Sequence, residues 1–323
     1  MSTPNQRTAS QSVWDQACER LAQQQWPAPA LYVVATPIGN LADLTPRAWY
    51  ALSQADVIAA EDTRATRVLL DAWHIDGELM SVHRHNERSR LDPVLERLAT
   101  GQRVALVSDA GAPGVSDPGG HLIQAVRAAG FPVVALPGAS AVITTLMSFG
   151  TTTDDHPGFA FLGFLPPKSG QRQRLLQRWL DYDGTLVCFE APHRLQSCLQ
   201  DMLAVFGGQR EVGLARELTK RFEETARLPL SQVQQWLDAD SHRLQGEYVL
   251  LVSPRLDAAA ALTDESDLSA DASSAQWADA LLAHVSTRDA ARIMAKALAR
   301  PRDACYAWLL ARSALRDGGH DAN

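Results

Sequence analysis

The chain is poor in cysteine, in lysine and in long apolar runs, and each shortage excludes a class of protein. Its four cysteines lie far apart, with neither a CxxC pair nor a Cys/His cluster, so we expect no zinc site, no other metal site and no disulfide framework. No apolar run approaches the length of a membrane span, and the glutamine-rich start lacks the apolar segment of a signal peptide. These features predict a cytoplasmic protein without a membrane segment.

Positive charge is also in short supply. The 323 residues include 37 acidic and 30 basic residues, which gives a formal net charge of −7. A protein coated in positive potential is thereby excluded, so any nucleic-acid contact must be a local patch. All but three of the basic residues are arginine, which suits bidentate contacts to phosphate but also follows from a GC-rich genome.

Short apolar runs alternate with helical segments in the first half of the chain, which predicts a mostly parallel sheet. Thr45 and Pro46 suit the N-cap and the first position of the first of these helices. We expect an N-terminal α/β lobe over residues 31–150. Its strands are predicted at Leu31–Ala35, Val57–Ala60, Val104–Val107 and Val133–Leu136.

The remaining chain divides into four predicted parts. We expect a disordered polar leader over residues 1–30, a second α/β lobe over 158–254, a flexible acidic linker over 255–275 and a helical, helix-turn-helix-like module over 276–316. The strands of the second lobe are predicted at Phe159–Leu162, Thr185–Phe189, Val212–Ala215 and Tyr248–Val252. The fold class is therefore α/β, with two lobes and a small C-terminal helical module.

The loops that follow the predicted strands hold the unusual residues. Residues 109–120 contain four glycines and two prolines, so this loop has a fixed shape that lets backbone approach a ligand. It lacks the endings of a Walker loop and the spacing of a dinucleotide-binding loop. One such loop could simply turn the chain, but comparable loops on neighbouring strands favour a ligand crevice at the carboxyl ends of the strands.

Nine motifs along the two lobes carry a resemblance to a known family. They are TPIGNL (36–41), AAEDTR (59–64), HRHNE (83–87), VSDAGAPGVSDPG (107–119), LPGASA (136–141), GFLPPK (163–168), FEAPHRL (189–195), ARELTK (215–220) and GEYVLLV (246–252). In this order and spacing they resemble the ribosomal RNA small-subunit methyltransferase I family of the tetrapyrrole-methylase superfamily. Gly114 departs from the family pattern, which has a larger apolar residue there.

The resemblance implies a homodimer that binds S-adenosylmethionine between its two lobes. The family's reaction is 2′-O-methylation of a cytidine in the decoding region of 16S ribosomal RNA, in the small ribosomal subunit. The alternative is a small-molecule methylase of the tetrapyrrole type, against which the AAEDTR, HRHNE and ARELTK motifs speak. By motif, the cofactor-binding residues would be Pro37, Ala110, Gly111, Ala112, Val115, Ser140, Ala141, Glu190 and Leu218.

A ribose hydroxyl is a weak acid, so a base or a cation near it should help the transfer of a methyl group. The catalytic candidates stand in or beside the matched motifs: Asp109, Glu190, Glu217 and Lys220. Each of the carboxylates could instead cap a helix or pair with a neighbouring arginine.

Basic and hydrogen-bonding side chains in the motifs and the tail are candidates for RNA contact. They are Arg64, His83, His85, Asn86, Lys168, Arg172, Arg194, Arg288, Arg292 and Lys296. In the tail, Arg288, Arg292, Lys296 and Arg300 recur every fourth residue and so share one helical face. Asp62 or Thr63 could merely cap a helix beside Arg64, and the charged faces could merely be solvated.

Overall fold

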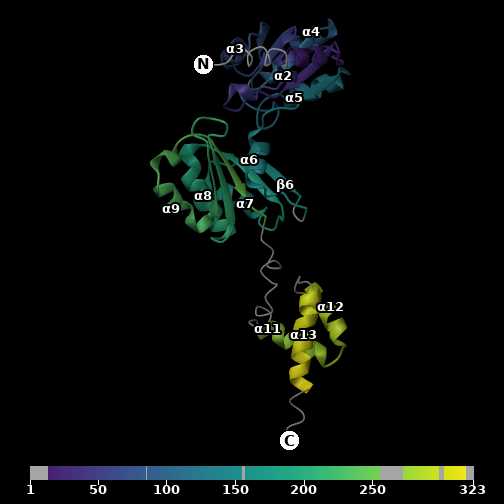
Figure 1. Ribbon diagram of the computed structural model, residues 1–323, viewed down its shortest axis with the longest axis vertical. Coiled ribbons are helices and arrows are strands. Elements are labelled where there is room, and N and C mark those ends of the chain that lie inside the picture. The colour runs from purple at the N-terminus through teal and green to yellow at the C-terminus, as the bar shows by residue number, and fades with distance from the viewer. Residues whose placement is uncertain (1–13, 85, 155–156, 255–271, 298–301, 318–323) are drawn as a thin grey trace. The chain divides into compact units, whose positions relative to one another are not determined.

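The computed structural model describes residues 14–84, 86–154, 157–254, 272–297 and 302–317. The chain divides into two compact units, Met1–Pro254 and Arg255–Asn323, which are considered one at a time (Figure 1). No helix in these ranges is both long enough and apolar enough to cross a bilayer.

The first lobe is a parallel five-stranded sheet in the order β3-β2-β4-β1-β5. Its central strands are short runs of small and β-branched residues that are buried along most of their length, as in a sheet covered on both faces. The strands are β1 (Ala30–Val34), β2 (Val57–Ala60), β3 (Glu78–Ser81), β4 (Arg103–Val107) and β5 (Val133–Leu136).

Helices cover both faces of this sheet. Successive strand residues point to opposite faces, so Ile58 packs in one cluster and Val57 in the other. The cluster of Ile58 includes residues of α2 (Pro46–Ser53) and α3 (Thr63–Ala72), and that of Val57 includes residues of α4 (Leu91–Ala99) and α5 (Gly120–Ala128). The 3-10 turns η1 (Leu41–Asp43) and η2 (Glu87–Arg90) precede α2 and α4.

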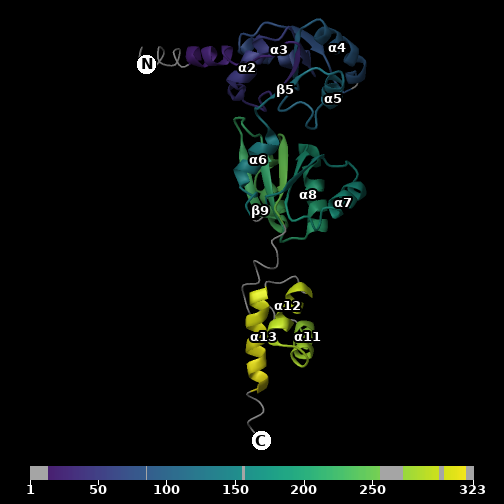
Figure 2. The ribbon, with the colours of Figure 1, turned by 90° about the vertical axis from the view of Figure 1, so that its right-hand side faces the viewer.

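The second lobe is a mixed sheet in the order β6-β7-β10-β8-β9, in which β6 and β7 are parallel and the other neighbours antiparallel. One face packs against α7 (Ser169–Gln177), α8 (Pro192–Phe206) and α9 (Val233–Asp238). The other face packs against α6 (Ala141–Phe149), which Figure 2 shows beside the strands. The strands are β6 (Phe159–Phe164), β7 (Thr185–Glu190), β8 (Glu211–Arg216), β9 (Glu224–Pro229) and β10 (Tyr248–Val252).

Side chains start the helices that follow β1 and β2. Thr45 Oγ1 accepts a hydrogen bond from the Ala48 amide at 3.1 Å, and Pro46 holds the first helical position of α2. Asp62 caps α3 by accepting from the Arg64 amide at 2.8 Å. The predicted cap at Thr45 is confirmed, and of the two readings of the AAEDTR turn the helix cap is present.

The prediction of a disordered leader is wrong for the residues that the structure describes. Residues 14–22 are helical, Trp14 packs against Trp49 and Trp73 of the first lobe, and Leu21 is buried. The Trp14 ring lies 5.1 Å from that of Trp49, and Trp26 lies 4.9 Å from Tyr50. Residues 1–13 lie outside the described ranges.

The second unit contains three helices within residues 272–297 and 302–317: α11 (Ala272–Leu282), α12 (Thr287–Ala297) and α13 (Arg302–Asp317). They enclose a small core around Met294 and Trp308. Ser286 Oγ accepts from the Asp289 amide at 3.2 Å and so caps α12. Residues 255–271 of the predicted linker lie outside the described ranges, and residues 272–275 belong to α11 instead.

Candidate functional site

A cavity of about 400 Å³ lies where the loops after β1, β4 and β5 meet the second lobe, and we call it the inner cavity. This volume is within the range of small-molecule sites. Its lining is mostly small and apolar, with a few polar side chains. It consists of Ile38, Ala110, Gly111, Ala112, Val115, Asp117, Ser140, Ala141, Val142, Phe164, Phe189, Glu190, Ala191, Pro192, Ala215, Leu218, Lys220, Glu247, Tyr248 and Val249.

Backbone hydrogen bonds fasten the first loop to the glycine- and proline-rich third loop. The Thr36 amide donates to the Gly111 carbonyl at 2.8 Å, and the Gly111 amide donates to the Thr36 carbonyl at 3.0 Å. Gly111 has φ +77°, a backbone conformation that residues other than glycine rarely adopt. The glycine therefore allows the bridge that forms this wall of the inner cavity.

Eight of the nine residues predicted to bind the cofactor line the inner cavity; the exception is Pro37, whose neighbour Ile38 lines it instead. Phe164, Phe189 and Tyr248, which were not among the predicted residues, form an aromatic wall of the inner cavity. Each of the three stands inside one of the motifs, but apolar strand residues look like ordinary core residues in a sequence, so they were not singled out as cavity residues. Phe164 is 59% exposed although it ends a strand.

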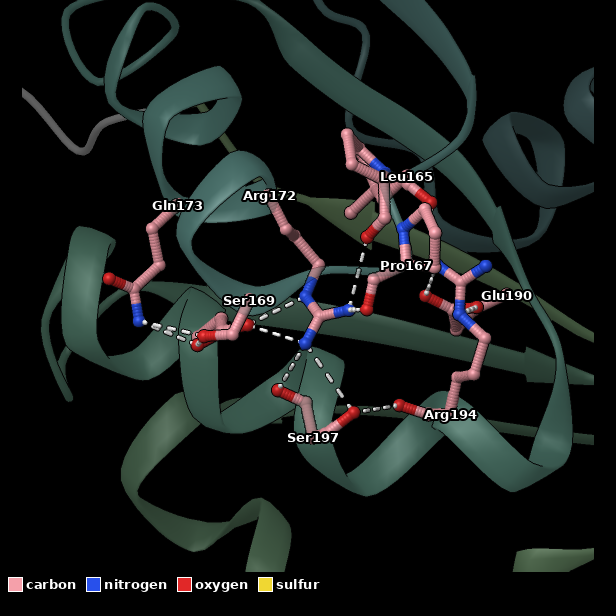
Figure 3. Close-up of polar contacts among 10 residues, drawn as sticks. Leu165, Pro167, Ser169, Arg172, Gln173, Glu190, Arg194 and Ser197 are labelled. Carbon is pink, nitrogen blue, oxygen red and sulfur yellow. Dashed lines mark hydrogen bonds and ion pairs between the residues drawn. The ribbon is translucent and has the colours of Figure 1, made fainter.

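Glu190 is a buried part of the cavity wall whose carboxylate is already engaged. Its Oε2 accepts from Arg194 Nη2 at 3.3 Å (Figure 3). Its Oε1 accepts from the Ala191 amide at 2.9 Å. Arg194 Nη2 also donates to the Leu165 carbonyl at 2.5 Å. These partners hold the carboxylate in one position within the cavity wall.

Lys220 brings a positive charge to the inner cavity. Its Nζ donates to Glu217 Oε1 at 2.9 Å and to Glu247 Oε2 at 2.8 Å. Burial lowers the pKa of Lys220, but the bonds to Glu247 and Glu217 outweigh it and the pKa is raised. Lys220 is thus held as a cation. It is not a general base at neutral pH.

The other two catalytic candidates do not line the inner cavity. Glu217 stands behind Lys220, and its Oε1 also accepts from the Glu247 amide at 2.9 Å. Burial raises the pKa of Glu217, but hydrogen bonds from the Glu247 backbone and Lys220 outweigh it and the pKa is lowered. Asp109 is exposed and accepts from the Asp62 amide at 2.9 Å.

Asp117, which was not among the predicted site residues, lines the inner cavity and interacts electrostatically with Asp109 and Glu61, which do not line it. Burial, followed by the negative charge of Asp109, raises the pKa of Asp117, whereas Arg84 acts in the opposite direction. Burial and the charges of Asp109 and Asp117 likewise raise the pKa of Glu61. The signal was present in the sequence, because Asp117 stands inside the VSDAGAPGVSDPG motif.

Known proteins identify the family of this chain. The family model of the tetrapyrrole (corrin/porphyrin) methylases matches residues 30–234. Ribosomal RNA small subunit methyltransferase I of Vibrio cholerae is 48% identical over 72% of this chain and 79% of its own length. The protein of the same name in Neisseria meningitidis serogroup B is 44% identical over 85% and 91%. The chain belongs to the ribosomal RNA small subunit methyltransferase I family. The predicted family and enzyme class, a methyltransferase, are confirmed.

Solved structures support the fold assigned to this methyltransferase I chain. The methyltransferase CobJ has a TM-score of 0.53 and 21% identity, over 70% of this chain and 94% of its own. The uroporphyrin-III C-methyltransferase of Thermus thermophilus, complexed with S-adenosylhomocysteine, has a TM-score of 0.51 and 19% identity, over 69% and 97%. At these identities the likeness establishes the fold alone, and the predicted two-lobed α/β class is confirmed.

Among the RNA-contact candidates of this methyltransferase, Arg172 is misassigned. Only 2% of it is exposed, because its Nε donates to Asp201 Oδ2 at 2.7 Å and its Nη1 to the Pro166 carbonyl at 3.2 Å (Figure 3). It fixes the GFLPPK loop to α8, so the prediction of an RNA contact is wrong. Arg194 is mostly buried and engaged with Glu190, and its RNA contact stays a prediction.

Among the candidates in the first lobe, Asn86 serves local structure and Arg64 is open to solvent. Asn86 accepts from the His83 amide at 2.7 Å and donates to the Ser81 carbonyl at 3.2 Å, so it shapes the loop after β3. Arg64 is 91% exposed and pairs with Asp62 at 2.9 Å. His85 lies outside the described residues, and Lys168, before α7, is exposed.

The basic face predicted for the tail is present on α12. Arg288, Arg292 and Lys296 are all exposed, and Arg292 has a loose ion pair with Asp289 at 3.5 Å. Ala290, Ala291 and Met294 of the same helix are buried in the core of the second unit. Arg300 lies outside the described residues.

Proposed function

We propose that this chain transfers the methyl group of S-adenosylmethionine to the 2′-hydroxyl of a cytidine ribose in the decoding region of 16S ribosomal RNA. The observation that carries the proposal is the inner cavity itself, because the loops that the family motifs mark converge on it. We also propose that the chain acts in the cytoplasm, as a homodimer, on the small ribosomal subunit.

The lining of the inner cavity fits S-adenosylmethionine. An adenosine and a methionine chain need apolar walls and a few polar anchors. Ala112, Val115 and Leu218 supply apolar surface, and Ser140 and Glu190 supply polar anchors. When bound, S-adenosylmethionine would supply a methyl carbon that is activated by its bond to a sulfonium sulfur.

The residues of the chain then have to align the ribose oxygen and keep water out. Alignment of two reactants can lower a reaction barrier by about 7–11 kcal/mol, so a rigid wall matters more than a covalent partner. Glu190 and its partner Arg194 make such a wall. Lys220, held as a cation, is placed to stabilise negative charge that develops on an oxygen.

RNA contacts are proposed at the exposed cations of both units. Arg64 and Lys168 are exposed in the first unit, and Arg288, Arg292 and Lys296 form the basic face of α12 in the second. Contacts to phosphate depend strongly on salt, so RNA affinity should fall steeply as ionic strength rises. Local patches of this kind reconcile RNA binding with the net charge of −7.

The decisive experiment maps ribose methylation on small-subunit RNA from cells with and without the gene, with the purified protein and S-adenosylmethionine added back to the unmethylated subunit. We expect one cytidine to lose its 2′-O-methyl group and regain it. An unchanged methylation pattern, or no binding of S-adenosylmethionine in a calorimeter, would overturn the proposal. Methylation of a porphyrinoid but not of RNA would instead support a tetrapyrrole-type methylase.

A further inference from the structure

A second hollow, of about 590 Å³, lies in the first lobe, and we call it the outer hollow. Its lining comes from η2, the glycine- and proline-rich loop and the start of α5. It consists of Arg84, Glu87, Arg88, Asp117, Pro118, Gly120, His121 and Gln124. Four of these residues belong to the HRHNE and VSDAGAPGVSDPG motifs, but binding of the cofactor in the inner cavity does not explain why a second open hollow has such polar walls.

The side chains available in the outer hollow are mainly cationic. Arg84, Arg88 and His121 are exposed, and within the described part of the chain Arg88 has no ion-pair partner. Glu87 is 6% exposed and accepts from the amides of Gly119 at 3.1 Å and Leu122 at 3.0 Å. The Glu87 carboxylate thereby holds the start of α5. Besides the carboxylate of Asp117, two guanidinium groups and an imidazole remain, a set suited to phosphate oxygens.

Arg84 also ties the outer hollow to the wall of the inner cavity. Its Nη2 donates to the Ser116 carbonyl at 3.2 Å, next to Asp117. Among the described residues, Asp117 alone lines both the outer hollow and the inner cavity. A group bound in the outer hollow therefore meets a molecule bound in the inner cavity at this carboxylate.

Resting on the function proposed above, we propose that the outer hollow binds the RNA backbone beside the target nucleotide and that Asp117 accepts the proton of the target hydroxyl. The hydroxyl O–H bond breaks and its proton passes to a carboxylate oxygen of Asp117. The hydroxyl oxygen forms its new bond to the methyl carbon, and the electron pair of the broken methyl–sulfur bond stays on sulfur. Arg84 and Arg88 hold the adjoining phosphates.

The geometry is supported by the acid–base properties of this residue. A base is most effective when its pKa lies nearer to the working pH than that of an ordinary carboxylate. Burial and the neighbouring Asp109 raise the pKa of Asp117, which makes it a stronger base than an isolated aspartate. Asp109 itself is exposed and lines neither hollow.

The test of the base is Asp117→Asn, which keeps the shape of the side chain, with Asp71→Asn, exposed at the end of α3, as its matched control. For Asp117→Asn we expect affinities for S-adenosylmethionine and for small subunits to stay within about 2-fold, and the single-turnover rate to fall about 100-fold or more. The acid limb of the pH–rate profile should also disappear. Asp117→Glu should restore part of the rate and the limb.

The test of the outer hollow is Arg84→Ala and Arg88→Ala, with Arg127→Ala, exposed at the far end of α5, as the matched control. We expect each of the two variants to weaken binding to small subunits and to reduce the slope of log affinity against log salt by about 0.9. Affinity for S-adenosylmethionine should not change. The control should match the wild type in all three measurements.

The outcomes separate this inference from the function on which it rests. If the wild-type protein methylates the subunit and Asp117→Asn retains its rate and its acid limb, Asp117 is not the base. If Arg84→Ala and Arg88→Ala bind subunits as tightly as the wild type, RNA does not enter the outer hollow. If the wild-type protein neither binds S-adenosylmethionine nor methylates the subunit, the proposed function itself has failed.

Discussion

Arg194 Nε lies 3.1 Å from Glu190 Oε1, and the pair joins the first turn of α8 to the end of β7. The Glu190 side chain has no exposed surface, whereas 21% of the Arg194 side chain is exposed. Glu190 belongs to the wall of the inner cavity, so the arginine holds a carboxylate that is buried within that wall. Stability and ligand binding are therefore linked at this pair.

Removal of Arg194 alone should leave a buried, uncompensated carboxylate. For Arg194→Leu we expect the free energy of unfolding to fall by about 3 kcal/mol, the lower end of the range for a buried pair. Affinity for S-adenosylmethionine should fall as well. Urea unfolding and calorimetry measure the two effects. The double variant with Glu190→Gln should recover part of the stability, and a double variant no better than the single one would contradict this account.

The buried pair of Arg172 and Asp201 predicts a loss of stability in acid. Burial raises the pKa of Asp201, but hydrogen bonds from Gln173, Ser169 and Arg172 outweigh it and the pKa is lowered. A carboxyl group whose pKa is lowered in the folded state stabilises the protein at pH values above its unfolded-state pKa. This stabilisation is lost as the pH falls through the folded-state pKa. We expect that loss to begin at about pH 4.

Urea unfolding as a function of pH measures this contribution. Asp201→Asn should be less stable at neutral pH and should lose less stability than the wild type on acidification. Asp92→Asn, an exposed residue of α4, should follow the wild-type curve. Parallel acid curves for the wild type and Asp201→Asn would show that Asp201 has an ordinary titration.

A large side chain at Gly111 should close the inner cavity. We expect Gly111→Trp to abolish binding of S-adenosylmethionine in a calorimeter, because position 111 lines the cavity. Gly130→Trp is the matched control, since Gly130 also has positive φ, +84° against +77°, but has open space around it. Both variants carry the backbone strain, about 1–2 kcal/mol. If Gly111→Trp bound S-adenosylmethionine normally, the cofactor would have to bind outside the inner cavity.

Charge reversal on α12 should separate RNA binding from cofactor binding. We expect Arg292→Glu to weaken binding to small subunits, and more so at low salt, because the Arg292 side chain is 72% exposed on the basic face. Affinity for S-adenosylmethionine should stay unchanged. Arg127→Glu, in the first unit, controls for the change in net charge. Equal subunit binding by Arg292→Glu and wild type would leave the basic face as a solvated surface.

Strands with a continuous apolar run could be predicted from the sequence, including the edge strands β5 and β6, whereas β3 and β9 could not. β2, β5 and β10 have the predicted bounds, because each is a short run rich in β-branched and apolar residues. The two strands that were missed, β3 and β9, are edge strands. An edge strand has less surface to bury and needs no continuous apolar run, so Glu78–Ser81 and Glu224–Pro229 gave no clear pattern.

The site could be predicted where glycine and proline shape a loop, and less well where charge decides. The loop residues around Gly111 were found because their composition is unusual. Arg172 was misassigned because its partner Asp201 is 29 residues away and charge alone does not reveal burial. Asp117 was missed for a related reason, since the same motif holds Asp109 and Asp117, and the sequence does not reveal that Asp117 is the one that lines the two hollows.

The paired backbone hydrogen bonds between Thr36 and Gly111 join two loops into one structural unit. Neither loop can swing without breaking the bonds of the other, so a ligand that displaces the first loop tilts the glycine- and proline-rich loop with it. Asp117 rides on that same loop and so follows any such tilt, which gives the occupant of one compartment a mechanical influence on the other.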